Sequence, residues 1–416
     1  MVPVVVGHSK KRRNPRRKIK RQRTPRSVNV QKIVVSVRKI TPRYCNIGLL
    51  LTVLGLTIFG IFMIYSASHY NATVYYDDPF YYTVKQLIGL VMGAIGLGVM
   101  YFIDYRVLQK LAYVIFGVAV LLLAAVFIPG IGIAKLGATR WVGVGSFSLQ
   151  PSEIAKFALV IFAAKIFALR PKAEAEKQAS ERLTAPRWWQ TLAVLAAGGV
   201  LCLLIILEPN MSITMTVGII MLVLLFLCGV RLRTLALILL PALAAVGVML
   251  VAEPYRLKRL SAFVDPWANP KGEGFQLIQS LYGIANGGFW GVGYGNSVQK
   301  NMFLPFAESD FIFAIIAEEF GLVGCLALFA VFGVIVYKIF RIGIQCRDYF
   351  GRYLCYGIGT VIMVQAGLNF AVSTGCIPPT GLPLPFISFG GTSLLVFMMA
   401  IGIVLNVDKQ NKKMLS

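Results

Sequence analysis

The chain has 416 residues, of which 57% are hydrophobic and only 14% are charged. An ordinary soluble domain carries about 25% charged residues, so this composition excludes a typical water-soluble globule. The formal net charge is +24, and fifteen Lys and Arg residues with no acidic residue fall within residues 1–44. The excess positive charge is therefore largely a property of one end of the chain.

We expect residues 1–44 to form a basic, disordered cytoplasmic tail. Beside a hydrophobic body, such a tail is typical of attraction to the anionic headgroups of membrane lipids. The rest of the chain lacks the basic surface of nucleic-acid-binding proteins, so we expect no nucleic-acid partner. The apolar run over 46–68 is too long for the core of a cleaved signal peptide, which predicts that it stays in the membrane.

Ten segments are long and apolar enough to cross about 30 Å of hydrocarbon as helices. They span residues 46–68, 82–103, 110–128, 151–169, 190–208, 211–229, 234–252, 311–337, 354–375 and 391–406. With the N-terminus inside, the inner segments carry thirty-one Lys and Arg residues and the outer loops carry seven, which is the asymmetry of the positive-inside rule. The sequence predicts an all-α integral membrane protein with ten transmembrane helices and both termini in the cytoplasm. Residues 45–408 form its membrane domain and 409–416 a short tail.

Three outer loops are expected, at 129–150, at 253–309 between the seventh and eighth helices, and at 376–390. Long loops on a rigid scaffold often carry function. The second loop contains a glycine-dense stretch at 287–295, which lacks the strand and helix context of a dinucleotide site, and we expect a short helix over 275–284.

Several common catalytic motifs are absent from the sequence. It has no Walker A, HExxH or Gly-x-Ser-x-Gly motif, which removes the support for ATP-driven transport and serine hydrolase chemistry. Its seven cysteines form no CxxC pair, and we expect no metal site built from them.

Charged groups near membrane depth are expensive to bury, so the few that occur there are candidates for function. Glu153 and Lys156, at the start of the fourth segment, lie three residues apart on one helix face and can pair. Pro151 suits the first helical turn, and Ser152 or Glu153 suits a cap. Two interpretations stay open here, a capped helix start with one ion pair or a charged functional site.

Asp310 immediately precedes the eighth segment. It can cap that helix and complement its dipole. Alternatively, it is a partly desolvated carboxylate at the outer mouth of the bundle, near cations such as Lys156 or Arg140, and can accept a proton from a substrate.

Polar residues also occur within the later segments. Glu318 and Glu319 lie in the eighth segment, and Gln365 and Asn369 lie four residues apart in the ninth. They are typical of interhelical polar contacts, or alternatively of residues that line a cavity. The Pro- and Gly-rich loop 376–390 is predicted to re-enter the bundle as one wall of that cavity, because irregular backbone at membrane depth needs protein or water around it.

Several short motifs occur in order along the chain. They are Tyr65-Ser66-Ala67-Ser68, Arg140-Trp141, Gln150 to Lys156, Gly274-Phe275-Gln276, Leu304-Pro305 to Ala314 with Glu318-Glu319, and Pro385 to Ser393. In these motifs the chain resembles the SEDS family of membrane proteins, over about residues 46–407. The Phe-Ile-Ser form of the last motif, Asp-Pro-Trp at 265–267 and the basic N-terminus look more like the cell-division and sporulation branch of that family than its elongation branch.

The resemblance implies a peptidoglycan glycosyltransferase that polymerises lipid II in the bacterial cytoplasmic membrane, at the division septum. It also implies a class B penicillin-binding transpeptidase and other division proteins as partners. In this family the acid that ends the Leu-Pro motif is the essential one, and that position is Asp310. Two stretches depart from the family pattern. Glu208-Pro209-Asn210 stands where Gln-Pro-Asp is common, and Phe306 replaces the acid after the proline, with Glu308 two residues further on.

In this mechanism Asp310 is the general base that takes a proton from the attacking sugar hydroxyl. Lys156 and Arg140 are candidates for stabilising the departing pyrophosphate, with Glu153 orienting Lys156. Trp141 is expected to pack against sugar or lipid.

The remaining expected site residues complete the substrate-binding set or line the cavity. Gln150 and Ser152 belong to the first group, and Glu319, Gln365, Asn369 and Ser388 to the second. A divalent cation such as Mg²⁺ or Mn²⁺ is left open for the pyrophosphate, although no paired-carboxylate motif is present, and no other cofactor is expected.

Two other classes of function are compatible with the sequence. A lipid II flippase would also need polar groups within a bundle of helices. However, alternating access predicts matching sites on both faces and internal symmetry, whereas the candidate residues cluster on the outer side. A non-catalytic division scaffold that acts through its N-terminal tail is the third interpretation.

Overall fold

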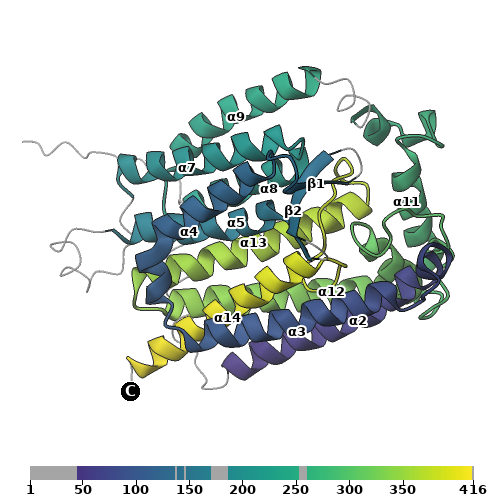
Figure 1. Ribbon diagram of the computed structural model, residues 1–416, viewed down its shortest axis with the longest axis horizontal. Coiled ribbons are helices and arrows are strands. Elements are labelled where there is room, and N and C mark those ends of the chain that lie inside the picture. Colours follow the sequence, from purple (N-terminus) through teal and green to yellow (C-terminus); the bar gives the residue numbers. More distant parts are fainter. Residues whose placement is uncertain (1–44, 136–137, 145–146, 170–185, 253–259, 415–416) are drawn as a thin grey trace, which may run out of the picture. The chain divides into compact units, whose positions relative to one another are not determined.

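The computed structural model describes residues 45–135, 138–144, 147–169, 186–252 and 260–414 (Figure 1). The expected basic tail at 1–44 lies outside the described residues. The helices are α2 (Cys45–Tyr76), α3 (Tyr81–Phe102), α4 (Arg106–Ala125), α5 (Pro151–Ala168), α7 (Trp188–Leu207), α8 (Met211–Leu227), α9 (Leu232–Ala252), α11 (Phe275–Gly287), α12 (Ile312–Gln345), α13 (Tyr349–Ser373) and α14 (Gly391–Lys413), with a short 3-10 helix η1 (Pro266–Ala268).

Each of the ten expected segments coincides with a helix. Among the described residues, seven of these helices are long and apolar enough to span a membrane, namely α2, α3, α4, α7, α12, α13 and α14. The apolar helical stretches in α8 and α9 are shorter, and α5 carries three charged residues. Several helices run past the expected ends, since α2 continues to Tyr76, α12 to Gln345 and α14 to Lys413. The short helix expected over 275–284 is present as α11.

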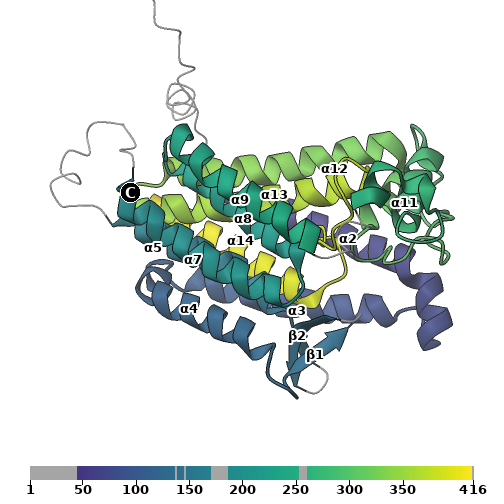
Figure 2. The ribbon, with the colours of Figure 1, turned by 90° about the horizontal axis from the view of Figure 1, so that it is seen from above.

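The expectation of a purely helical chain is wrong for residues 132–149. This segment forms an antiparallel sheet in the order β1-β2-β3, from β1 (Gly132–Lys135), β2 (Ala138–Val144) and β3 (Phe147–Leu149) (Figure 2). β-Branched and aromatic residues such as Thr139, Trp141 and Val142 favour pleated, half-buried strands. The strands are only three to seven residues long, too short for their sequence pattern to distinguish them from a loop.

The most enclosed helices are α5, α13 and α14. In α5, fourteen of eighteen residues are buried. Glycines allow close approach, as is common between membrane helices. A Cβ on Gly357 of α13 would lie 2.2 Å from Val160 of α5, and one on Gly402 of α14 would lie 2.4 Å from the carbonyl oxygen of Leu97 in α3. Charged residues on α5 therefore sit in protein and need partners there.

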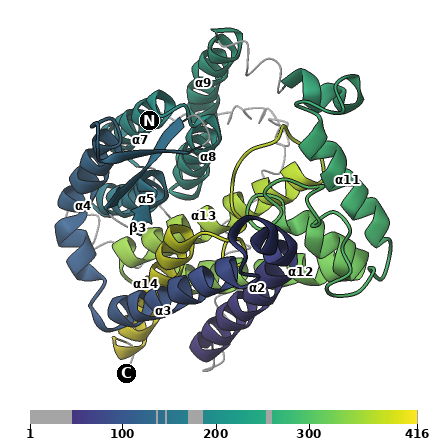
Figure 3. The same cartoon turned by 45° about the vertical axis from the view of Figure 1, so that its right-hand side comes forward.

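The segment between α13 and α14, residues 374–390, returns into the bundle. A Cβ on Gly60, in the middle of α2, would lie 2.7 Å from the Cα of Ile387 and 2.8 Å from the carbonyl oxygen of Phe386. Leu382, Leu384 and Ile387 are buried. Because α2 also packs against α3 and α12 (Figure 3), this segment meets several helices at once.

Helix α12 contains a break near its start. Gly321 has φ 65° and ψ −164° within the helix. A Cβ at this position would lie 2.4 Å from the Gly291 nitrogen and 2.6 Å from the Phe289 carbonyl oxygen. Only glycine combines this positive φ with such close approach of another backbone. The break lets the segment after α11 lie against α12.

The sheet is attached to the turn between α7 and α8. Arg140 on β2 donates hydrogen bonds to the carbonyl oxygens of Glu208, at 3.4 Å from Nε, and Pro209, at 2.5 Å from Nη2. A cation at the carboxyl end of a helix satisfies its last carbonyls and complements the helix dipole.

The Glu208 side chain is buried beside this cation. It is 1% exposed, and neither carboxyl oxygen has a hydrogen-bond partner among the described residues. Burial raises the pKa of this carboxyl from 4.5 to about 8, although the Arg140 charge opposes the shift. The folded protein therefore favours the neutral acid.

This shift makes the free energy of unfolding depend on pH. Because the folded-state pKa lies above the unfolded value, the full stability is present below the unfolded pKa and is lost as pH rises toward about 8. We expect Glu208→Gln to melt near the wild-type temperature at about pH 5 and a few degrees higher at about pH 9. Thermal unfolding of the detergent-solubilised protein would measure this. The exposed acid Asp77 offers the control Asp77→Asn, and parallel pH profiles for wild type and Glu208→Gln would contradict the assignment.

Candidate functional site

Asp310 lies in the segment that leads into α12 and is partly exposed. Helix α12 starts at Ile312, and its N-cap position is Phe311. Asp310 therefore lies one residue outside the cap, and the interpretation as a helix cap is wrong. Its Oδ2 lies 3.0 Å from where a Cβ on Gly381 would be, so the carboxylate faces the 374–390 segment and glycine leaves room for it.

The backbone at Asp310 is held by a side chain of α13. Asn369 donates from Nδ2 to the carbonyl oxygen of Asp310, at 2.8 Å, and to that of Leu382, at 2.7 Å. Asn369 is 1% exposed. One buried amide thus joins the segment that carries Asp310 to the segment that returns into the bundle.

Ser388 makes a second connection between the same two segments. Its hydroxyl donates to the carbonyl oxygen of Ser309 at 2.5 Å and accepts from the backbone N–H of Leu384 at 2.7 Å. The next residue, Phe389, donates its N–H to the carbonyl oxygen of Glu308 at 2.9 Å. Residues 308 and 309 are therefore bonded directly to residues 388 and 389, and Asp310 is joined to Leu382 through Asn369.

Gln86 on α3 supports this arrangement and was not identified from the sequence. Its Nε2 donates to the Ser388 carbonyl oxygen, and its Oε1 accepts from the Gly390 N–H, both at 3.2 Å. It is 1% exposed. The available signal was an amide within an otherwise apolar helix, which needs a partner wherever it is buried.

The expected pair of Glu153 and Lys156 is present. Lys156 is fully buried, and its Nζ lies 2.8 Å from Oε1 of Glu153. Nζ also donates to Oε1 of Gln365 on α13, and Gln365 donates from Nε2 to the Pro383 carbonyl oxygen at 2.9 Å. Buried ion pairs need such additional hydrogen bonds to offset the loss of water.

The start of α5 differs in one respect from expectation. Pro151 occupies the first turn as predicted, but the N-cap is Gln150 and it makes no side-chain cap bond. Ser152 and Glu153 are buried inside the helix, and Ser152 Oγ and Glu153 Oε2 have no hydrogen-bond partner in the described chain. The expectation that Ser152 or Glu153 caps α5 is wrong, because both side chains turn into the bundle.

Gln365 and Asn369 connect the cation to the acid. They lie four residues apart on α13, and they bond to the neighbouring carbonyls of Pro383 and Leu382. Lys156 is thus linked to the Asp310 backbone through one helix and one loop. The expected cavity-lining residues Gln365, Asn369, Ser388 and Glu319 are all buried, with polar atoms bonded to protein groups.

Arg140 and Trp141 lie on β2, beside α5. The bonds described for Arg140 run to the α7–α8 turn. Trp141 pairs with Ile133 of β1 and is partly exposed. The strand that carries both residues thus contacts α5, and Gln150, just before α5, is also partly exposed.

Glu308 is a further acid that sequence reasoning left without a role. Burial raises the pKa of its carboxyl above the usual range, and its Oε2 lacks a hydrogen-bond partner within the described residues. It lies two residues before Asp310. Desolvation therefore disfavours the charged form of the Glu308 carboxyl.

A divalent cation at the pyrophosphate stays a prediction. No group of three or more His, Cys, Asp or Glu side chains that could hold a metal occurs among the described residues. Glu153 already pairs with Lys156. Because Mg²⁺ is commonly held by one or two carboxylates together with substrate phosphates, the described side chains by themselves assign it no ligand set.

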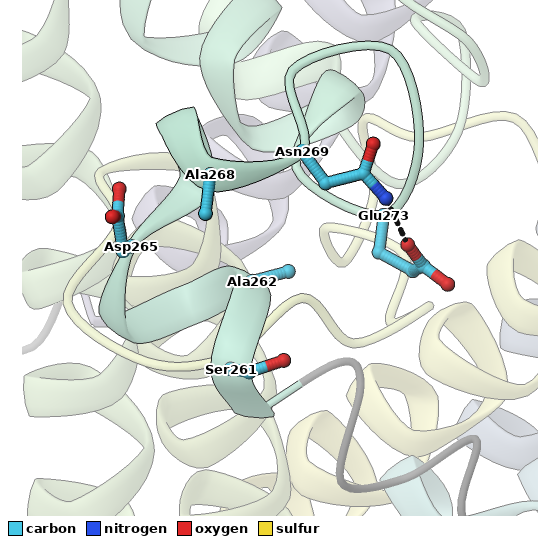
Figure 4. A pocket seen from close by; sticks show the side chains of 6 residues that line it. All are labelled: Ser261, Ala262, Asp265, Ala268, Asn269 and Glu273. Carbon is cyan, nitrogen blue, oxygen red and sulfur yellow. Dashed lines mark hydrogen bonds between the residues drawn. The ribbon is translucent and has the colours of Figure 1, made fainter.

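A cavity of about 250 Å³ lies elsewhere, in the segment between α9 and α11 (Figure 4). It is lined by Ser261, Ala262, Asp265, Ala268, Asn269 and Glu273. Asn269 donates to Glu273 Oε2 at 2.8 Å, and Asp265 accepts from the Trp267 N–H at 3.1 Å. Its lining includes none of the candidate catalytic or substrate-binding residues.

Comparison with known proteins covers nearly all of the described chain. Residues 47–413 match the cell cycle protein family of FtsW, RodA and SpoVE. A protein of Saccharophagus degradans named probable peptidoglycan glycosyltransferase FtsW is 39% identical, over 88% of this chain and 93% of its own length. Stage V sporulation protein E of Bacillus subtilis is 35% identical, over 87% of this chain and 96% of its own.

Solved structures agree with this relationship. A chain from a peptidoglycan synthase complex, described as coordinating polymerization and crosslinking, is 28% identical with a TM-score of 0.70, over 88% of this chain and 97% of that chain. The rod shape determining protein RodA of Thermus thermophilus is 25% identical with a TM-score of 0.63, over 88% and 96%. The extent of these matches shows that this chain belongs to the FtsW, RodA and SpoVE family of cell cycle proteins.

Proposed function

We propose that this protein is a peptidoglycan glycosyltransferase that polymerises lipid II into glycan strands during cell division. The observation that carries the proposal is its 39% identity, along almost the whole of both chains, to a relative named as such an enzyme. The bonded acid site at Asp310 supplies a group that fits the chemistry. The proposed role in division rests on several relatives that are named FtsW.

The proposed topology has ten crossings with both termini in the cytoplasm. In it, α5, α8 and α9 cross together with the seven longer apolar helices. Asp310 and the 374–390 segment then face the outer side, where glycan is assembled. The basic tail faces the anionic inner leaflet, in line with the positive-inside rule.

The proposed partner is a class B penicillin-binding transpeptidase, which would crosslink the strands at the septum. A solved relative belongs to a synthase complex in which polymerization and crosslinking are coordinated. Other division proteins complete the expected assembly.

In the proposed reaction a sugar 4-hydroxyl attacks the anomeric carbon of a second lipid-linked saccharide. The oxygen–carbon bond forms, the proton passes to the Asp310 carboxylate, and the lipid pyrophosphate leaves with the bonding electrons. A positioned general base contributes about 10²–10⁴-fold to such a step. Asn369 and Ser388 fix the backbone around the acid, which reduces the motion that would spoil its alignment.

Two cations have different parts in this proposal. Arg140 is partly exposed and can touch the pyrophosphate, with Trp141 packing against sugar or lipid and Gln150 close by. Lys156 is fully buried, so it acts through its positive charge and through Gln365. Glu153 pairs with Lys156, and Ser152 is buried beside them at the start of α5.

Asp310→Asn tests the general base. The amide has nearly the same shape but cannot accept the proton, so we expect folded, inserted protein that polymerises lipid II at least about 10²-fold more slowly. Gel analysis of glycan strands made by purified protein, with and without the transpeptidase, is the measurement. Asp77→Asn is the matched control at an exposed acid. Wild-type polymerisation by Asp310→Asn would refute the base assignment.

Lys156→Met tests the buried cation. Loss of the cation leaves Glu153 buried without its partner, which is strongly destabilising, so the double variant Lys156→Met with Glu153→Gln is compared. We expect the double variant to recover expression and thermal stability while turnover stays at least about tenfold low. If turnover returns together with stability, the pair is only structural.

Cys376 tests the proposed topology. It lies in the 374–390 segment and is exposed, unlike the other cysteines whose surroundings are described. A membrane-impermeant maleimide added to intact spheroplasts should label the wild type but not Cys376→Ser. Labelling only after lysis would place this segment in the cytoplasm and overturn the orientation.

A further inference from the structure

Two consecutive buried acids on α12 have no part in the proposed mechanism. Glu318 is fully buried and Glu319 is 1% exposed. They lie two turns after Asp310, just before the break at Gly321. Buried carboxylates are costly unless they are paired, so their partners indicate what they hold in place.

Glu319 joins α2, α12 and the segment that leads toward Asp310. Its Oε1 accepts from Lys300 Nζ at 3.0 Å and from Ser66 Oγ at 2.5 Å, and Lys300 Nζ also lies 2.9 Å from Ser66 Oγ. Lys300 is only 8% exposed. These three residues form a closed ring of charge-assisted contacts, which we term the Lys300 triad.

Glu318 holds the residues immediately before Lys300. Its carboxylate accepts from the backbone N–H groups of Val298 and Gln299, both at 3.2 Å, and from the hydroxyl of Ser297. Three donors from one short stretch therefore converge on one buried acid. The two neighbouring glutamates act on the same segment from the same turn of α12.

The main chain adds to this attachment. The carbonyl oxygens of Glu318 and Glu319 accept from the N–H groups of Val292 and Gly293, both at 3.0 Å. The break at Gly321 opens the helix for these contacts. Residues 292–300 are therefore fixed to α12 by side chains and backbone together.

Between Lys300 and Asp310 the backbone is strained. Met302 and Phe306 have φ of 64° and 57°, in the left-handed region that non-glycine residues rarely adopt. Such a conformation persists only where the surroundings impose it. The far end of the segment is already fixed by Asn369 and Ser388.

The near end of the segment lies beside a cavity. Lys300 and Ser66 border a cavity of about 270 Å³, which Tyr65, His69 and Tyr294 also line. Protein encloses most of the Lys300 side chain, and the bonds of the triad hold its ammonium group. Loss of those bonds would let the strained segment relax.

We propose that Lys300, acting with Glu319 and Ser66, is a positioning residue that sets the geometry of Asp310. The inference rests on the proposed function and adds a group that does not touch substrate. The triad fixes one end of residues 300–310, and Asn369 and Ser388 fix the other. Release of the first end moves the acid while the helices stay in place.

Lys300→Met is the first test, with two readouts on the full-length protein. Hydrogen exchange of peptides covering 300–312 should become faster, while exchange in the second half of α12 stays as in the wild type. Lipid II polymerisation should show kcat reduced at least tenfold and KM within about twofold, because small misplacements of a catalytic group can cost about 10²-fold. Lys300→Arg keeps the charge and should restore most of kcat.

Two further variants keep the test decisive. If Lys300→Met folds poorly because Glu319 is left unpaired, the neutral double variant Lys300→Met with Glu319→Gln replaces it. Lys412→Met breaks the ion pair with Asp408 near the end of α14 and should change neither readout.

Unchanged exchange over 300–312, or faster exchange with wild-type kcat, would overturn the proposal. Failure of the wild-type protein to polymerise lipid II would instead refute the proposed function. Hydrogen exchange needs no substrate, so this measurement alone would then decide whether Lys300 holds residues 300–310 in place.

Discussion

The need to pair buried charge determines how Asp310 is held. In the described part of the chain two lysines are buried, Lys156 and Lys300, and each forms an ion pair with a buried glutamate. Neither pair is isolated, since Gln365 joins the first and Ser66 the second. In a low-dielectric interior an ion pair is tolerable only with such extra bonds, and the groups that supply them bring distant elements together. One pair ties α5 to α13, and the other ties α2 to α12.

The irregular backbone inside the bundle also needs partners, in this case for its peptide N–H and carbonyl groups. The 374–390 segment carries peptide groups outside regular secondary structure, and it packs against the middle of α2. Gln86, Gln365 and Asn369 supply donors and acceptors to that segment from α3 and α13. Since buried backbone groups are costly when unpaired, these amides are as necessary to the loop as the apolar side chains are to the helices.

The sequence predicted the features that depend on local pattern. Apolar length located all ten helices, and the spacing of Glu153 and Lys156 predicted their ion pair. The sheet was missed because its strands are only three to seven residues long. The cap at the start of α5 was assigned to the wrong residues, because capping propensity says nothing about which side chains turn into the bundle. The pattern of apolar residues thus predicts where helices occur, and burial in the folded protein determines which residues lie at their ends.

The contacts around Asp310 depend on separations that no local pattern reveals. Ser66 and Glu319 lie 253 residues apart, and Lys156 and Gln365 lie 209 apart. A polar residue in an apolar helix, such as Gln86, signals that a partner exists but does not identify it, and Lys300 lies in a loop, where a charged residue gives no such signal.

The same separations imply an order of events. Each long apolar helix can enter a bilayer on its own hydrophobicity, whereas the bonds around Asp310 can form only after α2, α3, α5, α12 and α13 have packed. Insertion and site assembly therefore depend on different residues. Changes to the buried amides and ion pairs should act on the second step, so a chain can be fully inserted and still lack a correctly placed acid.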